Sequence, residues 1–173
     1  MEKTETHAAF EAFCLDFYNR DGVESACLAM QDTLDLDVVI LLLCCWTGRH
    51  GAYLSGEVLT AIDASARPWR ETVVEPLRTL RRRLKSAVGG MTPDISDPFR
   101  DSVKKLELDA ELLLIGYAAT LLEQVPGENA RAADRTGVIR GNIIRYAEGR
   151  GLNPIDLPRV YVEVLAKTAA DRM

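Results

Sequence analysis

The chain has 173 residues, of which 47% are hydrophobic, and its formal net charge is −5 at pH 7. A chain of this length and apolar content can bury one substantial core and rarely forms two domains. The acidic balance argues against a protein whose whole surface binds nucleic acid.

Residues 1–6 are polar and mixed in charge, unlike the basic and then apolar start of a secretory signal. We expect them to form a flexible tail before a single α-helical domain, residues 7–173, in the cytoplasm. The longest apolar run, residues 38–46, is about half of the ~20 residues that a membrane-spanning helix needs. We therefore expect no membrane partner.

Three helices are predicted in the N-terminal part. The apolar residues of the first recur every three or four positions: Phe10, Phe13, Cys14 and Phe17. The second spans residues 23–34. Asp37 is a suitable N-cap for the third, residues 38–47, which is apolar on every face and is expected at the buried centre of the fold. A buried strand is the alternative there, because residues 38–40 are β-branched.

The four cysteines, Cys14, Cys27, Cys44 and Cys45, all lie within apolar helical patterns. Their spacing matches neither a disulfide framework nor a paired metal-ligand motif. Cys44 and Cys45 are adjacent and would point about 100° apart on a helix. We expect buried thiols that act as small hydrophobic side chains, with no metal and no cofactor.

A short helix is expected over residues 55–64, with Ser55 as its N-cap. The next helix begins near Pro68, because proline suits the first helical turn. Pro76 lies inside that helix, where proline removes a backbone donor and clashes with the preceding turn. We therefore expect a kink or a split after Glu75.

The helix that begins near Pro68 has an apolar arc formed by Trp69, Val73, Leu77, Leu80, Leu84 and Ala87. Trp69, beside two arginines, could stack on a nucleic-acid base. Its place within the apolar arc favours packing in the core instead.

Six basic residues gather on the neighbouring arc of the same helix: Arg67, Arg70, Arg78, Arg81, Arg82 and Lys85. Residues 67–85 hold seven basic and two acidic side chains, a net charge of +5 that leaves −10 for the rest of the chain. Guanidinium groups bind carboxylates and phosphates through paired hydrogen bonds, so we predict a partner-binding site formed by these six residues. The alternative is a solvated helix face whose charges pair with Glu71, Glu75 and other acidic neighbours.

Residues 89–97 are rich in Gly, Pro and Ser and predict a loop. The longest helix follows over residues 98–125, and its second half is apolar on nearly every face. Two further helices are expected over residues 130–148 and 158–170. The sequence therefore predicts an all-α bundle of seven or eight helices around two central helices, residues 38–47 and 98–125.

The sequence contains few of the motifs that are typical of catalytic sites. The sequence has no serine–histidine or cysteine–histidine spacing typical of a nucleophilic site and no glycine-rich phosphate loop. Glu107 and Glu111 share a helix face, as in half of a di-iron bundle site, but the Glu-x-x-His partner motif is absent. The chain is therefore more typical of a non-enzymatic protein than of an enzyme.

Several short motifs follow one another in the first part of the chain: Phe10-x-x-Phe13-x-Leu15-x-x-Tyr18, Gly22-Val23, Ala26-Cys27-Leu28 with Gln31-Asp32, Asp37-Val38, Leu41-Leu42-Leu43, Trp46 and Trp69-Arg70-x-x-Val73-Val74-x-Pro76-Leu77-Arg78-x-Leu80-Arg81. In this order they resemble a proteobacterial family of small conserved proteins catalogued as a domain of unknown function. The resemblance covers about the first half of the chain and, more weakly, residues 104–111. It implies a bacterial cytosolic helical protein and carries no assigned reaction. Members tend to have asparagine where this chain has Val39.

We therefore expect an interaction protein, an adaptor or regulator that docks an acidic protein partner through the basic helix, residues 67–85. Binding of RNA or a ribonucleoprotein through the same arginines is the alternative, and it would weaken steeply with salt. A less favoured alternative is an anion-binding small-molecule protein or enzyme, with Arg70 or Arg78 holding the anion. A homodimer is also possible, because the apolar surface of residues 112–122 exceeds what a short bundle covers.

Overall fold

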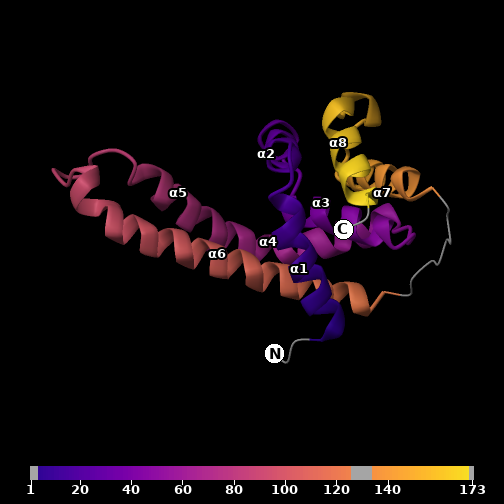
Figure 1. The fold of residues 1–173 in the computed structure, drawn as a ribbon, viewed down its shortest axis with the longest axis horizontal. Coiled ribbons are helices and arrows are strands. Elements are labelled where there is room, and N and C mark those ends of the chain that lie inside the picture. The colour runs from indigo at the N-terminus through magenta and orange to yellow at the C-terminus, as the bar shows by residue number, and fades with distance from the viewer. Residues whose placement is uncertain (1–3, 126–133, 172–173) are drawn as a thin grey trace.

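The computed structural model describes residues 4–125 and 134–171, and these residues confirm the all-α fold (Figure 1). They form eight α-helices, one π-helical segment and one short 3₁₀ turn, with no β-strand among them. The elements are α1 (Glu5–Tyr18), α2 (Val23–Leu34), α3 (Val38–Arg49), α4 (Gly56–Trp69), η1 (Arg70–Val74), α5 (Glu75–Arg83), α6 (Pro93–Glu123), α7 (Arg135–Gly149), η2 (Pro154–Asp156) and α8 (Arg159–Ala170).

The centre of the body is α3, as the sequence predicts. Its residues 39–45 are all buried, and the helix packs against α6, α7 and α8. The Asp37 carboxylate accepts a hydrogen bond from the Ile40 backbone N–H at 3.0 Å, which caps the helix. The alternative of a buried strand over residues 38–40 is wrong, because the cap and apolar surroundings on every side favour a helix. All four cysteines are buried, as predicted.

The first helix begins earlier than the sequence analysis placed it. The Thr4 hydroxyl accepts a hydrogen bond from the His7 backbone N–H at 3.1 Å, so Thr4 is the N-cap and α1 starts at Glu5. The predicted flexible tail over residues 1–6 is therefore too long, and residues 1–3 lie outside the described residues. The start of the predicted helix over residues 130–148 also lies outside them, and α7 starts at Arg135.

Helices α4, η1 and α5 follow one another without a break over residues 56–83. The helix predicted to end at Ala64 continues to Trp69, with Pro68 inside it, so a second helix starting near Pro68 is wrong. The predicted split after Glu75 is wrong, because α5 continues from η1 without a break. The hydrogen bonding changes just before that point, in the π-helical turn η1, where the Glu75 backbone N–H donates to the Arg70 carbonyl five residues earlier.

Residues 75–108 form an arm that extends from the body as an antiparallel pair, α5 and the first half of α6 (Figure 1). Its tip is a turn in which Val88 and Met91 exchange backbone hydrogen bonds at 3.0 Å. Helix α6 starts at Pro93, so the predicted loop over residues 89–97 begins and ends too late. Pro93 rather than Pro98 occupies the first turn, where a proline needs no backbone donor.

A close crossing of α3 and α7 depends on Gly48. A Cβ atom at this position would lie 2.6 Å from the Ile139 side chain and 2.8 Å from its backbone N and Cα. We expect Gly48→Ala to lower the free energy of unfolding by about 2 kcal/mol, since backbone atoms cannot move aside as a side chain can. Gly141→Ala is the matched control, because its Cβ would meet only the ring edge of Tyr53 and the end of Arg145. Denaturant unfolding measures both, and equal effects would contradict the crossing.

Candidate functional site

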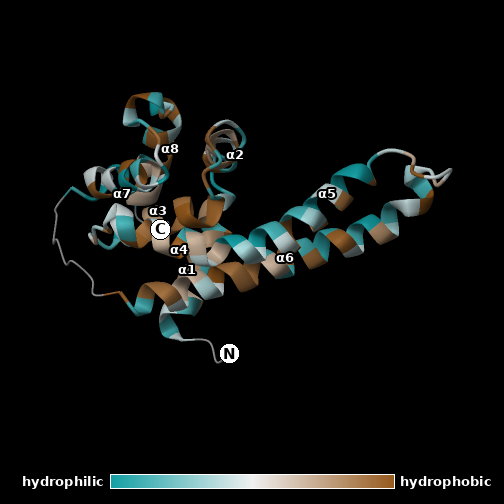
Figure 2. Cartoon of the chain, turned by 180° about the vertical axis from the view of Figure 1, so that it is seen from behind, coloured by the Kyte–Doolittle hydropathy of each residue, from teal (hydrophilic) through white to brown (hydrophobic). Residues whose placement is uncertain are grey.

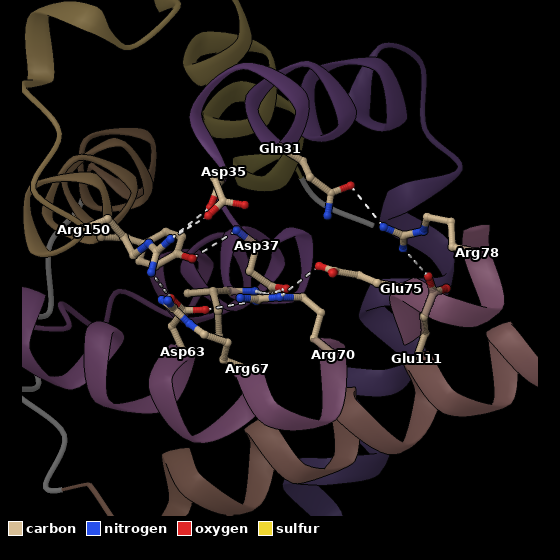
Figure 3. Close-up of polar contacts among 12 residues, drawn as sticks. Gln31, Asp35, Asp37, Asp63, Arg67, Arg70, Glu75, Arg78, Glu111 and Arg150 are labelled. Carbon is tan, nitrogen blue, oxygen red and sulfur yellow. Dashed lines mark hydrogen bonds and ion pairs between the residues drawn. The ribbon is translucent and has the colours of Figure 1, made fainter. Parts of the chain in front are cut away.

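Arg70 lies at the centre of a buried group of charges. Its Nη1 atom donates hydrogen bonds to the carboxylates of Asp37 and Asp63, the latter at 3.0 Å (Figure 3). All three side chains are buried. They come from η1, from the N-cap of α3 and from α4, so one guanidinium joins three elements. Burial lowers the pKa of Arg70, but Asp37 and Asp63 outweigh this effect and raise it above its ordinary value.

Two further arginines complete this group, which we call the inner cluster: Asp37, Asp63, Arg67, Arg70 and Arg150. Besides Arg70, Asp63 accepts from Arg67 at 3.1 Å and forms an ion pair with Arg150 at 3.3 Å. Arg150 also donates to Asp35 at 2.9 Å, at the end of α2. The cluster joins α2, α3, α4, η1 and the end of α7. Each buried carboxylate in it pairs with at least one guanidinium, which offsets the cost of burying the charge.

A second group, the arm cluster, joins α5 to α6: Arg78, Arg81, Glu107 and Glu111. Glu107 is buried and accepts from Arg78 at 3.2 Å and from both Nε and Nη2 of Arg81, the second at 3.1 Å. Glu111 accepts from Arg78 at 2.7 Å. Arg78 also donates to Gln31 of α2 at 3.3 Å, so the cluster ties the base of the arm to the body (Figure 3).

The two acids of the arm cluster differ in their pKa values. Burial raises the pKa of Glu107, but hydrogen bonds and charge from Arg81 and Arg78 outweigh it and hold the pKa below the usual range. Burial dominates at Glu111 and raises its pKa. Of the two acids, Glu107 therefore forms the stronger ion pairs with the arginines of the cluster.

A groove of about 350 Å³ lies between α2, the α2–α3 connection and α5. It is lined by Gln31, Asp32, Asp35, Leu36, Asp37, Arg70, Glu75, Arg78, Thr79 and Arg82. Its three arginines face four acidic residues, and Arg70 and Arg78 already donate to carboxylates of the chain. An anion entering the groove would compete with those carboxylates, so the groove does not favour the anion-binding alternative.

The six predicted partner-binding residues therefore fall into two groups. Arg67, Arg70, Arg78 and Arg81 are held by acids of the chain itself, as the alternative of paired charges suggested. Their use in partner binding stays a prediction. Arg82 and Lys85 are exposed and form no ion pair within the described residues.

Arg83 is a third exposed cation beside Arg82 and Lys85, and the sequence analysis left it out. On the helical wheel Arg83 lies beside the apolar arc, on the side away from the other basic residues, so it was not grouped with them. Trp69 also departs from prediction. It stays 39% exposed at the edge of α6 and donates from Nε1 to the Ala110 carbonyl at 3.0 Å, rather than packing in the core.

No group of three or more His, Cys, Asp or Glu side chains among residues 4–125 and 134–171 is placed to hold a metal ion. None of the described helices has the length and apolar character needed to cross a membrane.

Comparison with known proteins gives one match. Residues 10–117 match the family model described as "Protein of unknown function (DUF2390)". The chain belongs to this family, which confirms the resemblance found in its motifs. No curated protein and no solved structure matches the chain. The matched region ends at Tyr117, so it includes the arm and both clusters except Arg150.

Proposed function

We propose that this member of the family is a non-enzymatic interaction protein, an adaptor or regulator in the bacterial cytoplasm. Its arm docks an acidic surface of a protein partner. The observation that carries the proposal is a set of exposed cations on the arm that form no ion pair within the described residues: Arg82, Arg83, Lys85, Lys104 and Lys105.

The charge of the arm is opposite to that of the whole chain. Residues 75–108 contain eight basic and five acidic side chains, a net charge of +3 in a protein of net charge −5. A positively charged arm on a negatively charged body orients a partner as it approaches. It attracts acidic surfaces to the arm rather than to the body.

Apolar side chains at the tip favour a protein partner over RNA. Val88 and Met91 are exposed in the turn, close in sequence to Lys85. Protein interfaces combine such an apolar centre with a charged rim. Single-stranded nucleic acid is held instead by aromatic rings beside cations, and residues 82–91 contain no aromatic residue.

The arm cluster gives the proposed docking surface a fixed direction. Arg78 and Arg81 bind Glu107 across the hairpin, which holds α5 on α6 close to the exposed cations. Fewer conformations then have to be given up when a partner binds, and this improves affinity.

A triple charge reversal tests the docking surface. We expect Arg82→Glu/Arg83→Glu/Lys85→Glu to lose the partners that the wild-type chain captures from bacterial lysate, since like charges would then face each other. The matched control reverses three exposed cations of the body, Arg135, Arg159 and Lys167, and changes the net charge equally.

Circular dichroism must first show equal helicity for the wild type and both variants. Capture that is lost in both variants, or in neither, would contradict docking through the arm. Ribonuclease treatment separates the RNA alternative. A partner protein retained after RNA is digested supports the proposal, and loss of all captured material on digestion would overturn it in favour of RNA.

A further inference from the structure

The helix α6 carries an exposed apolar stripe that no described residue covers fully. Its members are Ile95 (61% exposed), Phe99 (59%), Leu106 (55%), Leu113 (61%) and Tyr117 (40%). The sequence analysis placed this helix in the core. The structure instead buries Val103 and Ala110 on an adjacent face and leaves the stripe exposed. Figure 2 shows hydrophobic residues, in brown, recurring along α6. A row of large apolar side chains of this kind marks an interaction surface.

The members of the stripe lie almost on one line. At about 100° per residue, the other four lie within about 20° of the direction of Leu106. Ile95 and Tyr117 are 22 positions apart, which corresponds to a stripe about 33 Å long. The successive spacings are four, seven, seven and four residues, and such spacings are typical of the contact line between two packed helices.

The stripe is also symmetric about its middle. Phe99 and Leu113 lie seven residues to either side of Leu106, and Ile95 and Tyr117 lie eleven residues to either side. A two-fold axis through Leu106 therefore superimposes the stripe on itself with its direction reversed. Such self-complementarity is the requirement for an interface between two identical chains.

We propose that this stripe binds the same stripe of a second copy of the chain, with the two α6 helices antiparallel. The two-fold axis passes between the Leu106 side chains of the two copies. Phe99 of each copy then packs against Leu113 of the other, and Ile95 packs against Tyr117.

Charges beside the stripe fit the same arrangement. Lys105 and Asp109 are exposed on one side of it, and neither forms an ion pair within the described residues. The two-fold axis brings Lys105 of one copy beside Asp109 of the other, about 3 Å apart along the helix direction. Two opposite-charge pairs therefore flank the contact between the Leu106 residues. A parallel pair of helices would not place these charges together.

Sedimentation equilibrium of the purified full chain tests the proposal. We expect the wild type to have twice the monomer mass at micromolar concentrations. We expect Leu106→Glu to weaken the dimer at least about 100-fold, because two carboxylates would meet on the axis. The matched control is Leu108→Glu. Leu108 is 47% exposed and points away from the stripe, so this dimer should keep the wild-type affinity.

A wild type that stays monomeric, or a Leu106→Glu variant that dimerises as tightly as Leu108→Glu, would overturn the proposal. Both substitutions replace exposed side chains, and circular dichroism checks that each variant folds. Dimerisation is measured with purified protein, and docking of an acidic partner at the arm is measured by capture from lysate. A failure of one proposal is therefore distinguishable from a failure of the other.

A charge exchange tests the antiparallel register separately. Lys105→Glu and Asp109→Lys should each weaken the dimer several-fold, and the double variant should recover the wild-type affinity because the pairs re-form with reversed sign. A double variant weaker than both single variants would contradict this register.

Discussion

Replacing Arg70 with methionine should lower the free energy of unfolding by about 3–5 kcal/mol, because it leaves two buried carboxylates without their shared guanidinium. Asp63 is completely buried and Asp37 nearly so. Arg67 and Arg150 still contact Asp63, but Asp37 forms its ion pair with Arg70 alone among the described residues. Chemical denaturation measures the loss.

Arg82→Met provides the control for the Arg70 prediction. It makes the same substitution in the same continuous helical segment, at an exposed arginine, and should change the free energy of unfolding by no more than about 0.5 kcal/mol. A triple variant, Arg70→Met with Asp37→Asn and Asp63→Asn, should recover part of the lost stability, since the buried charges are then removed together. Equal effects of Arg70→Met and Arg82→Met would show that the inner cluster does not stabilise the fold.

Glu107→Gln should loosen the arm while leaving the body folded. Arg78 and Arg81 both donate to Glu107, and a hydrogen bond to a charged group contributes about 1.5–3 kcal/mol. We expect the amides of α5 to lose about 2 kcal/mol of protection, a roughly 30-fold faster hydrogen exchange. Amides of α3 should exchange as in the wild type.

The control for the arm prediction is Asp101→Asn, which makes the same type of change at an exposed carboxylate of α6 that lies away from the apolar stripe. The pH dependence has a definite sign. The Arg81 and Arg78 contacts outweigh burial and lower the pKa of Glu107 from 4.5. The wild type therefore has its full advantage over Glu107→Gln above pH 4.5 and loses it as the pH falls through the lowered pKa. An advantage that grew as the pH fell would contradict this account.

Local patterns in the sequence predicted the helices of the body well. Asp37 followed by a wholly apolar segment specifies both the start and the burial of α3, because a cap and an all-round apolar surface leave few other solutions. Pro76 likewise lies close to the π-helical turn at Arg70–Val74, although the helical segment does not split after Glu75. Such features depend on neighbours within a few residues.

The clusters depend on contacts between distant parts of the chain. Asp63 and Arg150 are separated by 87 positions, and nothing in their local sequence indicates that they meet. Glu107 and Glu111 were recognised as a pair on one helix face, but not as the acids that bind Arg78 and Arg81. An amphipathic pattern shows that a face is apolar and not whether the chain itself covers it. For this reason the helix over residues 98–125 was predicted at the centre of the bundle, whereas its Phe99 and Leu106 are exposed.

Amine-specific cross-linking of the captured complex is the most direct test of docking through the arm. Three of the five lysines of the chain, Lys85, Lys104 and Lys105, lie on the arm, and Lys167 lies on α8 of the body. We predict that the partner protein is joined through Lys85 and Lys104. Cross-links confined to Lys167, with the arm lysines as reactive in the complex as in the free chain, would contradict the account.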